Sequence, residues 1–148
     1  MATLPEAIEL QIVTPERHVL QETVQSVEIP GKEGYLGVLP GHAPLLTELG
    51  VGILAYRKGS ENRFLTVIGG YAEVLPDRVI VLAEISEKAE EIDLARSKAA
   101  HDRAQAELAK HGIAADEYER EKLALERALI RMQAAGRAGS GAADGGAH

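Results

Sequence analysis

The sequence predicts a two-part fold, with a β-rich sandwich or barrel over residues 1–86 and an antiparallel two-helix hairpin over residues 87–135. All six prolines lie at or before Pro76, and nine of the fifteen glycines lie in residues 1–86. The first 86 residues carry 17 charged side chains, whereas the next 49 carry 20. This change in turn-forming residues and in charge density places the domain boundary close to Ser86.

Short apolar stretches bounded by turn residues predict strands in the first part. The composition is 45% hydrophobic but only 3% aromatic, so the core should consist of aliphatic side chains. Hairpin turns are expected at residues 58–62 and at Pro76-Asp77. Because no helix separates successive strands, we expect antiparallel pairing. The expected strands cover residues 8–12, 24–29, 53–56, 64–68, 72–75 and 79–82.

Capping residues delimit two helices in the second part. Asp93 is a good N-cap for a helix that ends near Gly112, and Asp116 is a good N-cap for the next helix. The connection over residues 112–115 is short, so the two helices should lie antiparallel.

The expected contact between the two helices uses a narrow stripe of small residues against a wider apolar stripe. Two such helices bury little apolar area, so the hairpin should be marginally stable without support from the sandwich or a partner. Marginal stability is the physical basis for a conformational switch. The stripes are Ala95, Ala99 and Ala106 on the first helix, and Tyr118, Leu125, Leu129 and Met132 on the second.

Residues 136–148 are rich in glycine, alanine and serine. This composition predicts a disordered tail.

Composition also limits the class of protein. The formal net charge of −7 argues against a nucleic-acid surface, which needs clustered Lys and Arg. The absence of cysteine excludes disulfides, thiolate zinc sites and thiol nucleophiles. No apolar run approaches the ~20 residues that span a bilayer, and no cleavable signal is evident. A cytoplasmic protein is expected.

No pattern of catalytic or metal-binding residues is present. The five histidines lack metal-ligand spacing, and neither a P-loop nor a Gly-x-Gly-x-x-Gly fingerprint occurs. The folded region also lacks a Gly-x-Ser-x-Gly nucleophile elbow. We therefore expect a protein that is not an enzyme, has no metal site and requires no cofactor.

Residues 31–44 hold four glycines and two prolines in fourteen positions. This density predicts a contorted loop rather than a strand, and loops of this kind usually present a surface to a partner or ligand. His42 in this loop has two interpretations: a side chain hydrogen-bonded to nearby backbone, or a contact with a partner.

Arg127 and Arg131 form a cationic pair one turn apart on the second helix. Most other charges on the two helices have an opposite charge three or four positions away, but the neighbours of these two arginines are Leu, Ala, Ile and each other. An anion would relieve the repulsion, and it could be a carboxylate elsewhere in the chain, an acidic partner surface or a phosphate. The alternative is a solvated cationic face.

Three motifs resemble those of one family, the epsilon subunit of bacterial F-type ATP synthase. The string Glu33-Gly-x-x-Gly-x-x-Pro-Gly-His-Ala-Pro44 resembles its signature loop. Residues 92–97 (Ile-Asp-Leu-Ala-Arg-Ser) resemble its ATP-binding motif Ile/Leu-Asp-x-x-Arg-Ala, with Ser97 where the motif has Ala. Residues 127–131 resemble its paired arginines, and the whole resemblance covers residues 5–135.

The resemblance implies a non-catalytic, central-stalk subunit of a proton-translocating ATP synthase rotor. Such a subunit binds the gamma subunit and the c-ring, and couples rotation of the c-ring to the catalytic head. Its C-terminal helices fold against the sandwich or extend toward the catalytic alpha and beta subunits, where they inhibit ATP hydrolysis. The expected location is peripheral, at the cytoplasmic face of the cell (inner) membrane.

The resemblance also implies site residues. ATP is a regulatory ligand in some members of the family, where it favours the compact hairpin. The matching positions here are Glu87, Asp93, Arg96, Arg127 and Arg131.

The same resemblance implies partner contacts in the glycine-rich segment. The surface around Tyr35, with Gly37 and Pro40, would touch the c-ring, and His42 would lie near the gamma contact. Two other hypotheses stay open from the residues alone: a stand-alone nucleotide-sensing module, and a purely structural assembly subunit whose arginines meet acidic protein surface.

Overall fold

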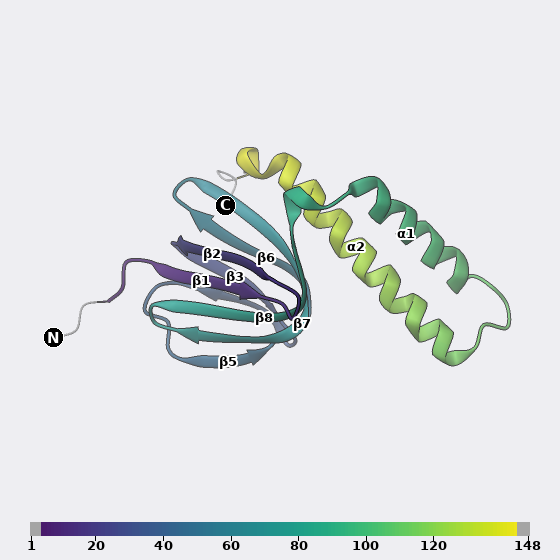
Figure 1. The fold of residues 1–148 in the computed structure, drawn as a ribbon, viewed down its shortest axis with the longest axis horizontal. Helices are drawn as coiled ribbons and strands as arrows, with labels where there is room; N and C mark the ends of the chain where they lie inside the picture. The colour runs from purple at the N-terminus through teal and green to yellow at the C-terminus, as the bar shows by residue number, and fades with distance from the viewer. Residues whose placement is uncertain (1–3, 145–148) are drawn as a thin grey trace.

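The structure is a computed structural model that describes residues 4–144, with side chains described through residue 138. Eight strands precede a short 3-10 turn and two α-helices in this part of the chain (Figure 1). The strands are β1 (Ile8–Val13), β2 (His18–Val24), β3 (Ser26–Gly31), β4 (Gly34–Val38), β5 (Leu45–Glu48), β6 (Val51–Lys58), β7 (Glu61–Leu75) and β8 (Arg78–Lys88). The helical elements are η1 (Ala89–Glu91), α1 (Leu94–Leu108) and α2 (Ala115–Asp144).

The strands form a folded-over sheet in the order β2-β1-β8-β7-β6-β3-β4, with β5 paired to β7. Strand β7 pairs with β6 along residues 61–68 and with β5 along residues 71–74. The change of partner occurs at Gly69 and Gly70, which have φ of 68° and 104°. A Cβ on Gly70 would lie 2.0 Å from the carbonyl oxygen of Leu82, so only glycine fits there.

A single aliphatic core fills the sandwich. Its buried residues come from all the strands except β5, and Tyr56 is the only aromatic among them. The expectation of an aliphatic core is therefore confirmed. The largest fully buried side chains include Ile8, Leu10, Ile12, Ile29, Leu54 and Leu65.

The β-sandwich is confirmed, but several strands differ from the expected ones. The stretch 24–29 is split, because β2 ends at Val24 and β3 begins at Ser26. The stretches 64–68 and 72–75 are parts of one strand, β7, bent at its two glycines. Strand β1 pairs with β8 in parallel, so the expected purely antiparallel arrangement is wrong for this pair. It needs no crossover helix because six strands and their turns connect its two members.

The hairpin of helices follows β8 with only residues 89–93 between them. Asp93 caps α1 as predicted, since its Oδ1 accepts a hydrogen bond from the backbone N–H of Arg96 at 3.1 Å. Gly112, with φ of 73°, lies in the turn that follows α1. Helix α2 begins at Ala115, so Asp116 lies in the first turn rather than at the N-cap. There its charge favours the helix dipole.

The stripes expected at the helix–helix contact are wrong for α1 and partly right for α2. Ala95, Ala99 and Ala106 are exposed, and the buried residues of α1 are Ser97 and Ala104. On α2, Leu125 and Met132 are partly buried, whereas Tyr118 and Leu129 are exposed at 43% and 38%. The heptad spacing predicts a single contact face on α2, but α2 packs against both α1 and the sandwich.

Helix α2 and the expected tail share residues 136–144. The helix runs to Asp144, so residues 136–144 of the expected tail are helical, and residues 145–148 lie outside the described residues. Ala134, Ala135 and Ala138 have the highest intrinsic helix propensity, and adding a residue to an existing helix is far less costly than starting one.

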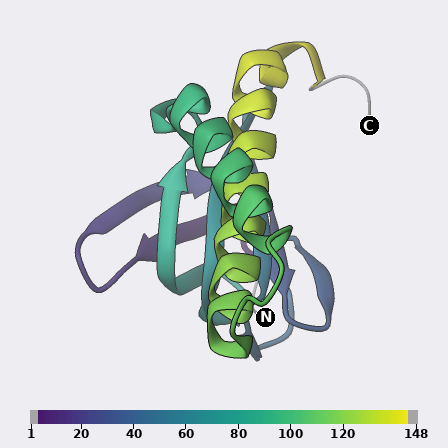
Figure 2. The same ribbon diagram turned by 90° about the vertical axis from the view of Figure 1, so that its right-hand side faces the viewer.

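Helix α2 lies between the sandwich and α1. It packs against β7, β6 and η1 on one side and against α1 on the other (Figure 2). The hairpin is therefore compact and docked on the sandwich in this structure.

Candidate functional site

A small apolar cluster joins α2 to the sandwich. Ile53 of β6, Ala89 of η1 and Ala134 of α2 are each at most 2% exposed, and partly buried side chains pack around them. We call this group the docking cluster. It is separate from the large sandwich core and much smaller, so the helices are held by few apolar contacts. The partly buried members are Phe64, Ile92 and Ile130.

One ion pair crosses the same junction. The Nε of Arg131 on α2 donates to Oε1 of Glu87 at the end of β8, at a distance of 2.7 Å. The two side chains are 30% and 35% exposed. Glu87 is thus the carboxylate that neutralises Arg131, one of the three anions that the sequence allowed. The structure brings together these two predicted site residues directly.

Strand pairing fixes the position of Glu87. Its backbone N–H donates to Oγ1 of Thr66 at 3.0 Å, and Thr66 itself is fully buried on β7. The neighbouring Ser86 donates its hydroxyl to the carbonyl of Thr66 at 2.8 Å. This network of satisfied polar groups makes the end of β8 a rigid support for the carboxylate.

Asp93 and Arg96 lie at the start of α1, immediately after Ile92 of the docking cluster. The carboxylate of Asp93 is occupied as a helix cap. Ser97, the departure from the family motif, is 6% exposed, and its hydroxyl donates to the carbonyl of Asp93 at 3.0 Å. The serine is therefore accommodated within the helix, with no unsatisfied polar group.

The guanidinium groups of Arg96 and Arg127 differ from that of Arg131. Within the described residues, neither has a carboxylate within 4.0 Å. Arg96 is exposed and Arg127 is partly buried. These two predicted site residues are the ones left available for an anionic ligand.

A second contact at this junction was missed by the sequence analysis. The guanidinium of Arg137 lies 5.6 Å from the centre of the Phe64 ring, which is cation–π distance. Arg137 lies in the segment expected to be a tail, for which the sequence predicts no contact. The one signal was Phe64 itself, the single phenylalanine of the chain.

The glycine-rich segment is less irregular than expected. Residues Gly34–Val38 form strand β4, which pairs with β3, so the prediction of a contorted loop over residues 31–44 is wrong for this part. A two-residue turn and Gly34, with φ of 135°, close the hairpin. The loop proper begins after Val38, where Gly41 has φ of 86°.

Tyr35 is 58% exposed, yet its hydroxyl accepts a hydrogen bond from the backbone N–H of Ile53 at 3.1 Å. Its ring crosses over Gly52, where an added Cβ would lie 2.6 Å from the Tyr35 hydroxyl oxygen. Gly37 is exposed. Tyr35 therefore supports the strand that carries Ile53 of the docking cluster.

His42 and Pro40 lie in the loop after β4 and are partly buried. The Nδ1 of His42 lies 2.7 Å from the carbonyl oxygen of Ala43, so this nitrogen donates. That contact fits the interpretation of a side chain bonded to nearby backbone, and Nε2 is left for other contacts.

A set of exposed apolar side chains lies across the sheet formed by β5, β7 and β8. Tyr71 and Leu82 are cross-strand partners and are each 55% exposed. Leu46 on β5 is 71% exposed, and it pairs with Glu73, two residues along β7 from Tyr71. We call Leu46, Tyr71 and Leu82 the apolar face. Exposed groups of large apolar side chains mark interaction surfaces.

The described residues contain neither a metal-binding cluster nor a membrane-spanning helix. No group of three or more His, Cys, Asp or Glu side chains could hold a metal ion there. In the same part of the chain, no helix is long and apolar enough to cross a membrane.

Two family models match the chain in succession. A model described as ATP synthase, Delta/Epsilon chain, beta-sandwich domain matches residues 7–89. A second, described as ATP synthase, Delta/Epsilon chain, long alpha-helix domain, matches residues 90–136. The break between them falls within η1.

Curated relatives are similar over nearly the whole sequence. ATP synthase epsilon chain 2 of Syntrophotalea carbinolica is 49% identical over 138 residues, which covers 93% of this chain and 100% of the relative. The ATP synthase epsilon chain of Solibacter usitatus is 50% identical over 113 residues, covering 76% of this chain and 84% of the relative.

Solved structures show the same fold. A chain in the structure of Euglena gracilis mitochondrial ATP synthase, OSCP/F1/c-ring, matches with a TM-score of 0.78 and 26% identity, covering 90% of this chain and 84% of that one. A chain in the Tetrahymena thermophila mitochondrial ATP synthase central stalk/c-ring matches with a TM-score of 0.54 at 15% identity, which shows the fold alone.

Proposed function

Because the chain belongs to the delta/epsilon chain family of ATP synthase, with bacterial epsilon chains as relatives, we propose that it is a non-catalytic subunit of the rotor's central stalk. In this proposal it couples rotation of the c-ring to the catalytic head, and its helices inhibit ATP hydrolysis. It lies on the cytoplasmic face of the cell membrane, peripherally, through the complex. The observation that carries the proposal is the weakly docked helical hairpin beside a rigid sandwich.

The sandwich offers two surfaces for stalk partners. The apolar face, with Leu46, Tyr71 and Leu82, suits a lasting subunit contact such as that with gamma. Tyr35, Gly37 and the loop with Pro40 and His42 form a second surface, which we assign to the c-ring and the nearby gamma contact.

The hairpin supplies the regulatory element. Among the described residues, its attachment includes the small docking cluster, the Glu87–Arg131 ion pair and the Arg137–Phe64 contact. A half-exposed ion pair and a cation–π contact each contribute about 1 kcal/mol or less. An attachment of this size can be exchanged for contacts with the alpha, beta and gamma subunits, so that the extended hairpin blocks rotation in the hydrolysis direction.

ATP binding would favour the docked hairpin. Arg96 and Arg127 lack carboxylate partners among the described residues and can receive phosphate, and Glu87, Asp93 and Arg131 complete the set of site residues that the family motifs imply. A ligand that binds only the compact form stabilises it by about 2.7 kcal/mol at a hundredfold excess over its Kd. That is larger than the contribution of either polar contact described above.

One observation favours a second candidate, a brace that does not respond to nucleotide. Arg131 already has a protein carboxylate, Glu87, so phosphate must compete for it. Calorimetric titration of ATP into the full chain, with and without Mg²⁺, separates the two. Saturable binding that is lost in Arg127→Ala supports nucleotide control, and no binding at millimolar ATP supports the brace.

The stalk function has a direct test. ATP synthase stripped of this subunit is reconstituted with the full chain or with a chain ending after Lys88, and ATP hydrolysis is measured. Both should restore coupling between rotation and synthesis, and only the full chain should inhibit hydrolysis. Failure of the full chain to assemble with the complex would overturn the proposal.

A further inference from the structure

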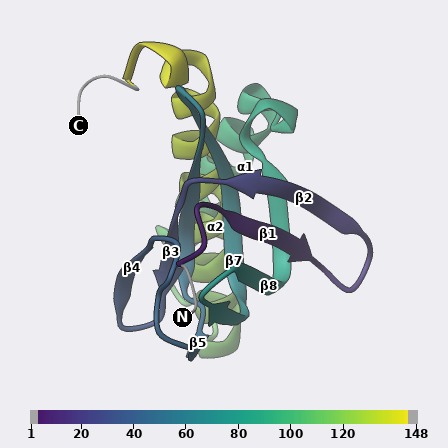
Figure 3. The same cartoon turned by 90° about the vertical axis from the view of Figure 1, so that its left-hand side faces the viewer.

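Strand β4 has a free edge, and Pro30 determines which of its backbone groups face it. Strand β4 lies at the end of the strand order and pairs only with β3 (Figure 3). Pro30 has no N–H, so its pair with Tyr35 must be a non-hydrogen-bonded pair of the antiparallel ladder. Hydrogen-bonded pairs alternate with such pairs, so Leu36 bonds to Ile29. The N–H and C=O groups of Tyr35 and Gly37 therefore point away from the sheet.

This edge lacks the usual protection. Natural sheets blunt their edges with Lys, Pro, bulges or a covering element. Residues 34–38 (Gly-Tyr-Leu-Gly-Val) carry no charge and no proline, and both glycines leave open space beside the backbone. Within the described chain, no backbone group of Tyr35 or Gly37 has a hydrogen-bond partner outside the β3–β4 ladder.

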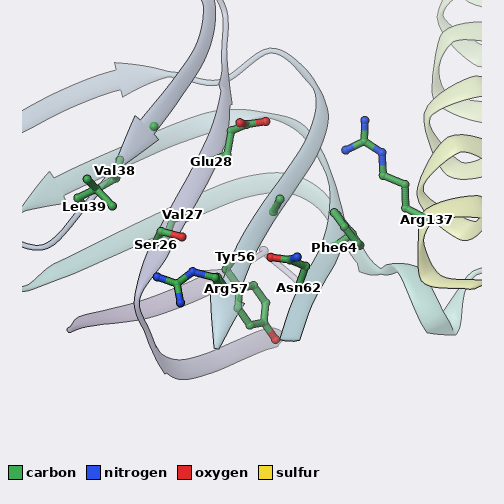
Figure 4. A pocket seen from close by; sticks show the side chains of 12 residues that line it. Ser26, Val27, Glu28, Val38, Leu39, Tyr56, Arg57, Asn62, Phe64 and Arg137 are labelled. Atoms are coloured by element: carbon green, nitrogen blue, oxygen red, sulfur yellow. The ribbon is translucent and has the colours of Figure 1, made fainter. Parts of the chain in front are cut away.

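A cavity of about 820 Å³ opens beside this edge. One cross-strand row, from Gly37 through Glu28 and Ala55 to Phe64, forms part of its lining. Arg137 reaches into it from α2 and lies over Phe64, as Figure 4 shows. Arg57 also lines it, so the cavity holds two guanidinium groups and one carboxylate.

From this geometry we propose that the free edge of β4 receives an extended segment of a partner subunit as an added strand. The unpaired groups of Tyr35 and Gly37 would hydrogen-bond to the segment's backbone, as in other strand-addition complexes. Alternate side chains of the segment would point into the cavity. The guanidinium groups of Arg57 and Arg137 there favour an acidic side chain over a basic one.

The inference rests on the proposed function, because it specifies how the surface at Tyr35 and Gly37 meets a stalk partner. A partner subunit is favoured over a second copy of this chain because the guanidinium groups in the cavity beside the edge favour binding of an acidic side chain. The strand of a second copy would bring only Tyr35, Leu36 and Val38, which are uncharged.

Amide hydrogen exchange tests the proposal with a pattern that only strand addition produces. In the free full-length chain, the amides of Tyr35 and Gly37 should exchange fast, and those of Leu36 and Val38 slowly. In the reconstituted ATP synthase, Tyr35 and Gly37 should become at least tenfold slower, with little change at Leu36 and Val38. Unchanged exchange at Tyr35 and Gly37 in the assembled complex would overturn the proposal.

Two substitutions at one position provide a matched pair. Gly37→Pro removes an N–H that the chain's own sheet does not use, and edge strands tolerate proline. Gly37→Ala keeps the N–H and puts a methyl group into open space. Both variants should melt near the parent. Loss of one hydrogen bond should weaken assembly of Gly37→Pro by about tenfold relative to Gly37→Ala, which keeps the N–H.

The outcomes separate this inference from the proposed function. Equal assembly of Gly37→Pro and Gly37→Ala overturns strand addition but leaves the stalk role intact. Failure of the parent chain to assemble overturns the stalk role itself. Protection of Tyr35 and Gly37 that rises with the concentration of the free chain would mean pairing between copies, which also contradicts a partner strand.

Discussion

Tyr35 links the surface of the sandwich to the place where α2 docks. Its ring lies over Gly52, and its hydroxyl accepts the N–H of Ile53, which belongs to the docking cluster. The sequence indicated Tyr35 only as a partner contact, through a motif. The hydrogen bond to Ile53 depends on the register of β3, β4 and β6, which no local pattern encodes.

Tyr35→Phe should destabilise the protein by about 1–3 kcal/mol, because the partly buried N–H of Ile53 loses its acceptor. Urea unfolding of the full chain measures the change. Tyr118→Phe is the matched control, since Tyr118 is 43% exposed and its hydroxyl has no hydrogen-bond partner in the described chain. Equal stability of the two variants would show that the Tyr35 hydroxyl does not support β6.

The Glu87–Arg131 pair should contribute a coupling free energy of about 1 kcal/mol to hairpin docking, at the upper end for a half-exposed pair. A double-mutant cycle with Glu87→Gln and Arg131→Met measures it from exchange protection of the amides of α1. The Lys110–Glu107 pair serves as the control, with a smaller expected coupling, because its lysine is 60% exposed and lies just beyond the end of α1. A coupling free energy of zero at Glu87–Arg131 would show that this ion pair does not stabilise the docked hairpin.

At the scale of elements, the existence of the sandwich, both helices and the α1 cap could be predicted from turn residues and capping chemistry. Strand β4 could not be predicted. The density of glycine and proline in residues 31–44 predicts a loop, whereas the strand is stabilised by pairing with β3, which a local pattern does not show. Local composition predicts a tail from residue 136, and helix α2 extends from Ala115 to Asp144 because adding residues to an existing helix costs little.

The site residues likewise include some features that local sequence predicts and others that only the folded chain shows. Motifs predicted Glu87 and Arg131 separately, and only the folded chain shows that they pair with each other. The helix faces were assigned by heptad spacing, which cannot reveal that α2 lies between two partners. Ala128 and Ala134 are only 1% and 0% exposed. Their small side chains allow α2 to pack closely against its neighbours.

Ala134→Leu should weaken docking of α2 by about 1–3 kcal/mol, because a larger side chain at a fully buried position overpacks the junction. Ala124→Leu, at an exposed position of the same helix, adds the same atoms without a neighbour to displace. Exchange protection of α1 and α2 should fall in the first variant alone. Similar protection in both would contradict the assignment of Ala134 to the docking cluster.

Over the whole molecule, stability is concentrated in the sandwich. All members of the large core lie between Ile8 and Ala83, so the helices contribute none of them. Among the described residues, the hairpin meets the sandwich through the small docking cluster, the Glu87–Arg131 pair and the Arg137–Phe64 contact. A molecule built in this way can release its helices without unfolding its sandwich.

A fragment of residues 1–88 should therefore fold by itself and unfold cooperatively, with a midpoint close to that of the full chain. A fragment of residues 89–144 should lack a cooperative transition, because two isolated helices bury too little apolar surface. Thermal unfolding followed by circular dichroism measures both. An unfolded 1–88 fragment would show that the helices are part of the folding unit.

If the docked hairpin must leave the sandwich to inhibit hydrolysis, then locking it in place should abolish inhibition. The chain has no cysteine, so cysteines introduced at Glu87 and Arg131 can be joined by a short, reducible cross-linker without competing thiols. Reconstituted ATP synthase carrying the locked chain should hydrolyse ATP without inhibition, and inhibition should return when the link is reduced. Full inhibition by the locked chain would show that the hairpin can inhibit hydrolysis while it is docked on the sandwich.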